Sequence, residues 1–404
     1  MPQENIKSSS IIRKSFGLKK EIQPQLHASY DSPLIDRLKT QDLRLKAGRL
    51  TLSLAREFGF CYGVDRAIDY AYETRAKFPD RRIFLTNEII HNPRVNAKLQ
   101  ELGIEFLSKD GGEGVKVEEL TPRDVVLIPA FGNPVKELEG FQKRGCVLVD
   151  TTCGSVMSVW KRVESYTRDG FTSVIHGKYD HEETLATSSR AHRYVIVRDK
   201  EQAEVVCDFI RGKVDRVHFM EEFKLALSSG FDPDRDLRNL GCANQTTMLS
   251  SESLEIANML QRTMAETFGD EEACRRFRHF DTICSATQDR QDAVLKLVRE
   301  GVDLMVVVGG YNSSNTGHLV EISLGFCPAY HIKDADCILS AGVIQHKKVM
   351  SRDIIETRGW LPEGDVRLGV TAGASTPNKV IEEVMEKIVE VGLGPLEARK
   401  VLTF

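Results

Sequence analysis

The sequence predicts an α/β protein made of several α/β domains, and three observations lead to this class. From residue 50 onward, short apolar runs of strand length alternate with amphipathic stretches at helical spacing. Three times, an apolar run leads to a cysteine that stands directly before a helical stretch. Polar loops rich in small residues also follow several predicted strands, where ligands collect in open α/β sheets.

Composition excludes several classes of protein. The chain has 404 residues, which is enough for two to four domains, and its 41% apolar and 28% charged residues are typical of globular proteins. A net charge of −4 argues against nucleic-acid binding, and no apolar run approaches the length of a membrane span. Nine cysteines, an odd number without a secretory signal, indicate a reducing compartment, so we expect a cytoplasmic protein.

Residues 1–50 are interpreted as an N-terminal extension. They carry ten Lys/Arg against five Asp/Glu, and one helix is expected over residues 33–46. A transit peptide for the plastid stroma is an alternative for this segment, although its acidic residues argue against one.

The elements that follow alternate between strands and helices. We expect strands at 50–54, 82–86, 125–129, 147–150, 173–176, 194–198, 304–308, 329–332 and 366–371, and helices at 65–78, 155–168, 251–268, 288–300 and 378–391. Residues 199–240 are more charged and are interpreted as an insertion with helices of its own. The predicted domains are therefore 51–153, 154–282 with this insertion, and 283–404.

The strand–cysteine–helix pattern occurs at Cys61, Cys153 and Cys284. Helix N-termini favour thiolates, so three such units could direct three thiolates to one centre. Three sulfur ligands suit a zinc ion or an iron–sulfur cluster with one open site, whereas three structural core cysteines are the alternative. The other six cysteines are expected to be structural, with Cys242 and Cys327 the least secure of them.

Two loops have the composition of an anion site. Gly309-Gly-Tyr-Asn-Ser-Ser-Asn-Thr316 and Gly373-Ala-Ser-Thr-Pro377 each follow an apolar strand and precede a helix. Hydroxyl and amide side chains at a helix N-terminus form a phosphate-sized site, although the same residues also serve as ordinary helix caps.

Further polar groups stand near strand ends. His91 and His181 could donate to phosphate oxygens, although a lone histidine is more often structural. Glu183 is a candidate proton donor if burial raises its pKa; otherwise it serves the dipole of its helix. Thr246, in a Gln-Thr-Thr triplet, could hold a small substrate or cap the helix that follows.

These residues resemble the motifs of the 4-hydroxy-3-methylbut-2-enyl diphosphate reductase family, the last enzymes of the methylerythritol phosphate route to isoprenoids. The matching pieces run in family order over residues 59–377. They are Gly-Phe-Cys61-Tyr-Gly-Val-Asp-Arg-Ala, Glu-Ile-Ile-His91-Asn, Asp-Thr-Thr-Cys153, His181-Glu-Glu183, Asn-Gln-Thr246-Thr, Ile-Cys284-Ser-Ala-Thr, Tyr-Asn-Ser313-Ser314-Asn315 and Thr-Ala-Gly-Ala-Ser375.

The resemblance implies a trefoil of three α/β domains around a central 4Fe–4S cluster. It implies that Cys61, Cys153 and Cys284 hold the cluster, that the apical iron stays open for the substrate alcohol, and that Glu183 and Thr246 form the proton path. The residues expected to clamp the diphosphate are His91, His181, Ser313, Ser314, Asn315 and Ser375. The expected products are isopentenyl and dimethylallyl diphosphate, with ferredoxin or flavodoxin as electron donor.

Two positions depart from the family pattern. Phe131 stands where many bacterial members have a histidine, and Gly154 replaces the usual proline after the second cysteine. Phe131, the extension and the enlarged middle domain resemble the longer branch from plants and cyanobacteria. Gly154 removes no ligand, so cluster binding is expected to survive.

Two other functions remain possible on the residues alone. A 4Fe–4S hydro-lyase would also use an open iron on an alcohol substrate, but it needs no electron donor. A zinc-stabilised binding protein would use the three cysteines without any chemistry.

Overall fold

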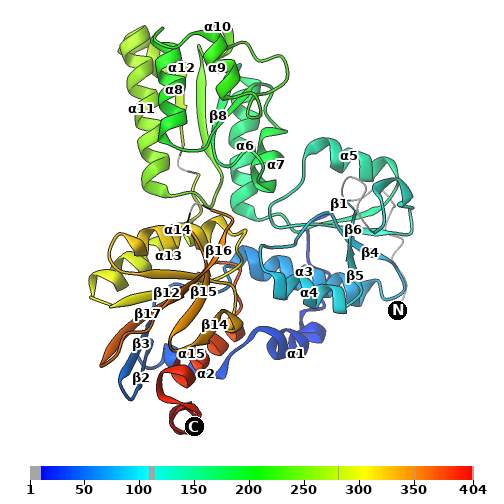
Figure 1. Cartoon of the computed structure of the whole chain (residues 1–404). Helices are drawn as coiled ribbons and strands as arrows, with labels where there is room; N and C mark the ends of the chain where they lie inside the picture. The colour runs from blue at the N-terminus through cyan, green and yellow to red at the C-terminus, as the bar shows by residue number, and fades with distance from the viewer. Residues whose placement is uncertain (1–10, 109–113, 281, 350, 403–404) are drawn as a thin grey trace. The chain divides into compact units, whose positions relative to one another are not determined.

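The computed structural model describes residues 11–108, 114–280, 282–349 and 351–402. This part of the chain forms three sheets flanked by helices, two of them entirely parallel and one mixed, which confirms the predicted α/β class (Figure 1). The chain divides into two compact units. The first contains the described residues of Met1–Lys14, Phe78–Ile89 and Leu102–Cys284; the second contains those of Ser15–Lys77, Ile90–Glu101 and Ser285–Phe404. The predicted domain boundaries stay a prediction.

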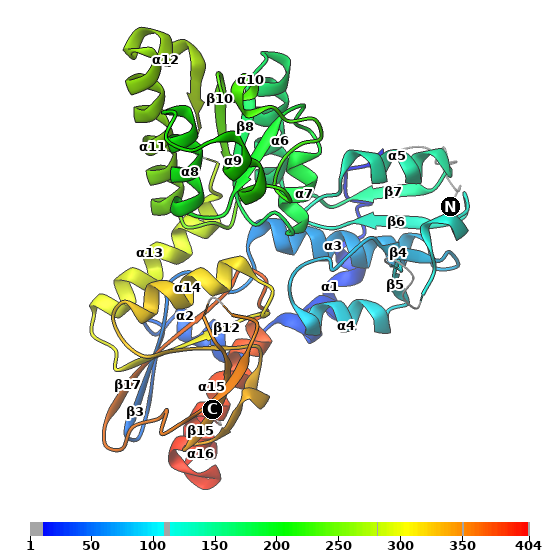
Figure 2. The same ribbon diagram turned by 45° about the horizontal axis from the view of Figure 1, so that its top comes forward.

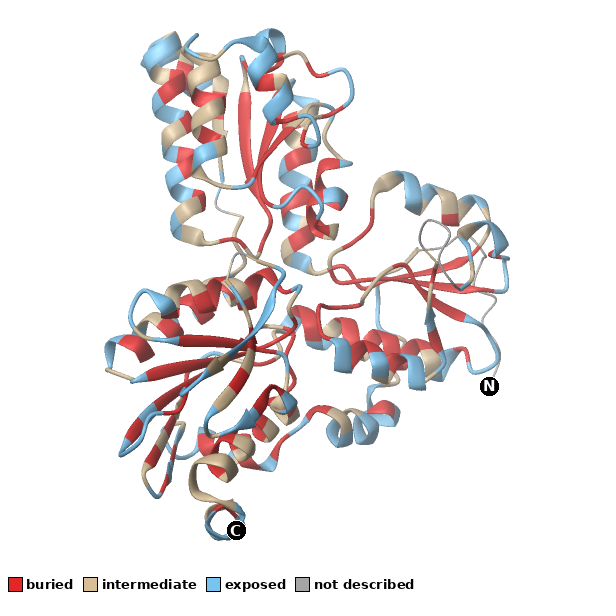
Figure 3. Ribbon diagram, viewed as in Figure 1, coloured by how far each residue is buried: buried red, intermediate tan, exposed pale blue. Residues whose placement is uncertain are grey.

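One sheet of the first unit is five-stranded and entirely parallel. Its order is β1 (Ile11–Ile12), β7 (Val147–Asp150), β6 (Val125–Ile128), β4 (Ile83–Leu85) and β5 (Ile104–Phe106), and η1 (Val117–Glu119) and α5 (Val135–Lys143) lie between its strands along the chain. All residues of β4, β6 and β7 are buried (Figure 3), as expected for parallel strands covered on both faces.

The other sheet of the first unit has four parallel strands in the order β11 (Phe277–His279), β10 (Leu240–Asn244), β8 (Thr172–His176) and β9 (Tyr194–Val197). Its long helices are α6 (Gly154–Arg168), α8 (Lys200–Ile210) and α11 (Ser250–Phe268); α7 (Glu182–Ser188), α9 (Arg216–Glu222), α10 (Pro233–Asp236) and α12 (Asp270–Arg276) are short (Figure 2). The sequence did not predict β10, because Gly, Cys and Asn interrupt its apolar pattern.

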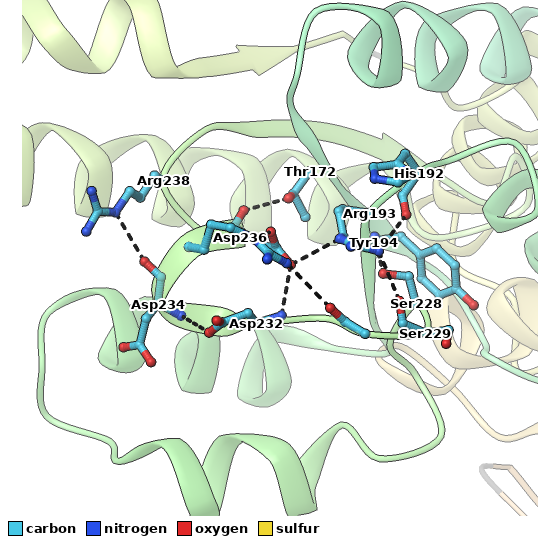
Figure 4. Close-up of polar contacts among 12 residues, drawn as sticks. Thr172, His192, Arg193, Tyr194, Ser228, Ser229, Asp232, Asp234, Asp236 and Arg238 are labelled. Atoms are coloured by element: carbon cyan, nitrogen blue, oxygen red, sulfur yellow. Dashed lines mark hydrogen bonds and ion pairs between the residues drawn. The ribbon is translucent and has the colours of Figure 1, made fainter.

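The predicted insertion does contain its own helices, α8 to α10, and a buried aspartate fastens its end (Figure 4). Asp236 accepts a hydrogen bond from the backbone N–H of Asp232 at 2.8 Å and pairs with Arg193 at 3.3 Å. Its carbonyl oxygen accepts the hydroxyl of Thr172, the first residue of β8, at 2.5 Å. These contacts hold the end of the insertion against the first residue of β8, one of the two inner strands of this sheet.

The second unit is built on one eight-stranded sheet that is parallel in its centre and antiparallel at its edges. Its main order is β14 (Ile338–Ser340), β15 (Val343–Lys347), β13 (Ala329–Ile332), β12 (Leu304–Val308), β17 (Val366–Ala372), β3 (Leu50–Leu54) and β2 (Arg44–Ala47), and β16 (Ile354–Arg358) pairs with β15. Because β3, β17 and β12 are parallel neighbours, the loops that follow them lie at the same edge of the sheet.

The helices of the second unit come from all three of its chain segments. They are α1 (Lys19–Tyr30), α2 (Pro33–Lys39), α3 (Tyr62–Lys77), α4 (Pro93–Glu101), α13 (Ser285–Arg299), α14 (Ser314–Leu324), α15 (Asn378–Leu393) and α16 (Pro395–Leu402), with η2 (Ala335–Cys337) before β14. No helix in the described ranges is both long and apolar enough to cross a bilayer.

Two local predictions were wrong. The helix expected over 33–46 ends at Lys39, because Asp42 and Leu43 take positive φ angles of 54° and 57° and the chain turns into β2, which pairs with β3. The strand expected to lead into Cys284 is β11, which already ends at His279, so that residues 282–284 form an irregular approach to α13.

Candidate functional site

The three candidate cysteines occupy equivalent local positions. Each stands immediately before a helix, namely α3, α6 or α13. Each donates its backbone N–H to a carbonyl oxygen two residues beyond the end of a parallel strand. These bonds join Cys61 to Ala374 after β17 (3.3 Å), Cys153 to Ala130 after β6 (2.9 Å) and Cys284 to Thr246 after β10 (3.3 Å). The predicted repeat is therefore real at the level of backbone hydrogen bonds.

Burial separates these cysteines from most of the others. Cys61, Cys153 and Cys284 are half-buried, whereas Cys146, Cys207, Cys242 and Cys337 are buried and Cys274 is exposed on α12. Burial raises the pKa of the Cys146, Cys207, Cys242 and Cys327 thiols, which disfavours the thiolate that a metal requires. Half-buried sulfur atoms at helix starts are the donor set that an iron–sulfur cluster needs.

The turn before Cys61 is fixed by a buried arginine that the sequence did not reveal. Gly59 takes a φ of +72°, and a Cβ there would lie 2.8 Å from the Oδ1 atom of Asn378. Arg290, on α13 and only 3% exposed, donates from Nη2 to the carbonyl oxygen of Gly59 at 2.6 Å. Its neighbours Ala286 and Val294 are ordinary helix residues, so no local pattern in the sequence indicates this contact.

The turn before Cys153 is organised by Asp150. Its Oδ1 atom accepts the backbone N–H of Thr152 at 3.0 Å and the hydroxyl of the same residue at 2.5 Å. A Cβ at Gly154 would meet no atom within 4 Å, so there is room for a Cβ at this position.

Glu183 is a buried carboxyl group joined to Thr246. Its side chain is 1% exposed, and its two oxygens accept the backbone N–H of Thr246 at 2.6 Å and the hydroxyl of Thr246 at 2.9 Å. Burial raises the pKa of Glu183 to about 7, although the two hydrogen bonds from Thr246 oppose that shift. Because the carbonyl oxygen of Thr246 also receives the N–H of Cys284, acid and cysteine are linked through one residue.

His181 caps α7 beside this acid. Its Nδ1 atom accepts the backbone N–H of Glu183 at 3.1 Å, so the neutral ring carries its proton on Nε2 and can donate from there. The ring of Phe131 meets the His181 ring edge to face, with centroids 5.6 Å apart. Phe131 thus supports the histidine through packing, where a histidine at this position could also have donated a hydrogen bond.

The second unit gathers the other anion-binding candidates. Ser313 caps α14 by accepting the backbone N–H of Thr316 at 3.2 Å, and Ser314 and Asn315 follow in the first turn. Asn315 accepts the backbone N–H of Ala374 on Oδ1 at 3.0 Å, while its buried Nδ2 has no hydrogen-bond partner among the described residues. An unsatisfied buried amide is costly, and it marks a place for a ligand acceptor.

His91 lies against the same two loops. Its carbonyl oxygen accepts the hydroxyl of Ser375 at 3.2 Å, and a Cβ at Gly310 would collide with that oxygen. The loop after β12 is held from behind by His331, whose Nε2–H donates to the carbonyl oxygen of Gly309 at 3.1 Å. Burial, aided by the charge of Lys347, lowers the pKa of His331 to about 4, so that it remains a neutral donor.

Most of the predicted site residues thus fall into two contact groups. In the second unit, Cys61 and Asn315 both bond to Ala374, and Ser375 bonds to His91. In the first unit, Thr246 bonds to both Glu183 and Cys284, while His181 bonds to Glu183. Sequence reasoning named these residues but missed Arg290 and His331, which act through backbone carbonyls.

Comparison with known proteins gives one consistent result. The model of the LytB protein family matches residues 52–389. A 4-hydroxy-3-methylbut-2-enyl diphosphate reductase from Gloeobacter violaceus is 49% identical over 394 residues, 96% of this chain and 94% of its own length. The reductase of the same name from Thermosynechococcus vestitus is 49% identical over 386 residues, 94% of either chain.

The comparison with solved structures gives the same family. A structure of (E)-4-hydroxy-3-methyl-but-2-enyl diphosphate reductase, the terminal enzyme of the non-mevalonate pathway, matches with a TM-score of 0.50 and 27% identity, over 84% of this chain and 99% of its own. The reductase from Plasmodium falciparum shares the fold with a TM-score of 0.60, at 23% identity over 86% of this chain and 89% of its own.

Proposed function

We infer that this chain, which belongs to the LytB family, catalyses the reaction for which its cyanobacterial relatives are named. That reaction is the reductive dehydroxylation of (E)-4-hydroxy-3-methylbut-2-enyl diphosphate to isopentenyl and dimethylallyl diphosphate. The observation that supports this assignment at the site is the bonded series Glu183–Thr246–Cys284, in which Thr246 bonds both to a buried carboxyl group and to a candidate cluster ligand.

Members of this family use an iron–sulfur cluster, and we propose that Cys61, Cys153 and Cys284 hold a 4Fe–4S cluster with one iron open. The half-burial of these thiols and their places before α3, α6 and α13 support the proposal. When bound, the cluster supplies electrons and a Lewis-acidic iron for the substrate's hydroxyl end.

The diphosphate is proposed to bind Ser313, Ser314, Asn315, Ser375, His91 and His181. The N-terminus of α14 contributes its dipole and backbone N–H groups, which favour phosphate oxygens. The Nδ2 atom of Asn315, which has no partner among the described residues, and the Nε2–H of His181 supply oriented donors. Several fixed donors orient the substrate without reorganisation at the moment of reaction.

Glu183 and Thr246 are proposed to deliver the proton that lets the hydroxyl leave as water. A carboxyl group with a pKa of about 7 still carries its proton near neutral pH, yet it can release it to a stronger base. The Thr246 hydroxyl can accept a proton on one side while it donates on the other, so it can pass a proton from Glu183 to the substrate.

The electrons come from a separate protein, for which ferredoxin or flavodoxin is our proposal, and the nine cysteines fit a reducing cytoplasm.

Consumption of reduced viologen tests the function. Anaerobically reconstituted protein is expected to oxidise reduced methyl viologen only when the hydroxylated allylic diphosphate is added, with both five-carbon diphosphates as products. Cys61→Ser, Cys153→Ser and Cys284→Ser should abolish this activity, while Cys207→Ser, a buried cysteine on α8, serves as the matched control. Loss of water from the substrate without viologen oxidation would instead identify a hydro-lyase.

A further inference from the structure

The N-terminal extension is built into the regions that carry two of the candidate cluster cysteines. Its strand β1 adds to the edge of β7 in parallel, with Ile11 opposite Leu148 and Ile12 opposite Val149. Immediately afterwards, Arg13 donates from Nε to Asp150 at 2.9 Å. Asp150 is the residue that organises the turn into Cys153, so the extension reaches this turn through one side chain.

The next residues of the extension anchor it in the second unit. The hydroxyl of Ser15 donates to both carboxylate oxygens of Glu73, at 2.9 and 2.8 Å, and the backbone N–H of Phe16 donates to one of them at 2.7 Å. Glu73 lies on α3, the helix that begins after Cys61, and is 1% exposed. A buried carboxylate that lost these donors would be strongly destabilising, so the segment is part of the folded structure.

The extension then reaches the Cys61 turn itself. Tyr30, the last residue of α1, is 6% exposed and packs on the ring of Phe60 with centroids 5.6 Å apart. Its hydroxyl lies 3.1 Å from that of Tyr72 on α3. Since Phe60 is bonded to Cys61, Tyr30 supports this turn in addition to the hydrogen bond that Arg290 makes with the carbonyl oxygen of Gly59.

We propose that residues 11–31 are a positioning element that holds the turns of Cys61 and Cys153 in ligand geometry before the cluster is inserted. The proposal rests on the cluster assignment of these cysteines under the proposed function. Tyr30 acts through Phe60 and Arg13 acts through Asp150, and neither touches the cluster or the substrate. The extension would then help the protein to retain its cluster. A targeting segment that is removed from the mature protein would have no such role.

Alkylation of the cluster-free protein tests the proposal without any enzyme assay. Each cysteine's reaction with iodoacetamide is followed by mass spectrometry of its peptide in the native protein. In Tyr30→Ala, Cys61 is expected to react about two- to tenfold faster, the range that loss of one aromatic contact gives, while Cys284 keeps its rate. Tyr30→Phe retains the ring contact with Phe60 and should restore the slow reaction of Cys61.

A second variant probes the other end of the extension. Arg13→Gln removes an ion pair between an exposed arginine and a buried aspartate, and it should accelerate Cys153 but not Cys61. Lys20→Ala, at an exposed position of α1, is the matched control and should change neither rate. The proposal would be overturned if the Cys61 rate is unchanged in Tyr30→Ala and the Cys153 rate is unchanged in Arg13→Gln. An equal increase in rate at all three cysteines would overturn it as well.

The outcome is separable from that of the proposed function. If the wild-type protein binds no cluster after reconstitution, the cluster assignment fails, whatever the alkylation rates are. If the wild-type protein binds a cluster and Tyr30→Ala loses its visible absorption in air no faster than Lys20→Ala does, the positioning role fails while the function stands.

Discussion

At the scale of single residues, the site depends on groups whose surroundings change their chemistry. Burial raises the pKa of Glu183 to about 7, so its carboxyl group is protonated below this pH and partly protonated at neutral pH. Asn315 keeps a buried amide nitrogen unpartnered within the described chain, although satisfying it would stabilise the protein. Such costs are typical of positions that serve a ligand rather than the fold.

Glu183→Gln should lower kcat by about 10²- to 10⁴-fold, the usual contribution of a positioned general acid, while KM changes little. Glutamine keeps the hydrogen bonds with Thr246 but carries no transferable proton. Initial rates with reduced methyl viologen measure both constants. In the wild-type enzyme, the rate should fall as the pH rises through about 7, where Glu183 loses its proton. A Glu183→Gln variant with the wild-type kcat would refute the acid role.

The same residue predicts a pH-dependent stability. The pKa of Glu183 is raised from its ordinary value of 4.5 to about 7, so its favourable contribution is complete below the ordinary pKa and is lost as the pH rises through 7. Glu183→Gln should therefore raise the Tm of the cluster-free protein at pH 8, and the gain should shrink towards pH 5. Thermal unfolding at the two pH values measures this difference; an equal gain at both would contradict the assigned pKa.

Phe131 gives a third prediction at this scale. Phe131→Ala removes an edge-to-face contact with His181, which is worth about 0.5–1.5 kcal/mol. We expect KM for the diphosphate to rise about two- to tenfold with kcat nearly unchanged, because His181 is proposed to bind the substrate and takes no part in the proton transfer. A lower kcat at constant KM would show that Phe131 acts elsewhere.

At the scale of elements, close approaches between loops set the anion-binding candidates in place. Gly310 lies so near the carbonyl oxygen of His91 that no Cβ fits between them. Gly310→Ala should therefore force the loop after β12 away from His91, cost about 1–3 kcal/mol of stability and weaken substrate binding. Gly317→Ala, on the helix that follows this loop, is the matched control, since a Cβ at Gly317 would meet no atom within 4 Å. Equal Tm values and equal KM values for the two variants would contradict this account.

The sequence predicted an element correctly where its pattern is local, and it failed where pairing with distant strands decides the structure. The apolar run 304–308 and the amphipathic run after Pro377 were identified within two residues, because both patterns are local. The helix expected over 33–46 failed because the pairing of β2 with β3 overrode a helical pattern, and β10 was missed because its neighbours β8 and β11 stabilise a weakly apolar strand.

The residues of the candidate site divide in the same way, between those with a local motif and those that act through distant contacts. Residues with chemistry of their own, such as Cys61, Glu183 and Asn315, were proposed from motifs, and their roles stay predictions. Arg290 and His331 were missed, since each acts through a backbone carbonyl of a residue far away in the sequence, namely Gly59 and Gly309. Such contacts leave no local pattern in a single sequence.

At the scale of the whole molecule, each unit contributes cysteines and polar donors of its own. Cys61 belongs to the second unit with the loops after β12 and β17, whereas Cys153, Cys284 and Glu183 belong to the first. If the proposed cluster binds these cysteines, its binding free energy adds to the stability of the folded protein. We therefore expect cluster removal to lower the Tm and to broaden the unfolding transition, since bound ligands stabilise only the folded state. Calorimetry of cluster-loaded and cluster-free protein tests this; identical transitions would contradict it.

Mössbauer spectroscopy of protein reconstituted with ⁵⁷Fe tests the central claim most directly, namely that three cysteines hold a four-iron cluster whose remaining iron meets the substrate. One iron in four should differ from the others, and its signal alone should change when the hydroxylated allylic diphosphate is added. Cys61→Ser should lose the whole spectrum. Four equivalent irons that ignore the substrate, or an unaltered spectrum in Cys61→Ser, would contradict it.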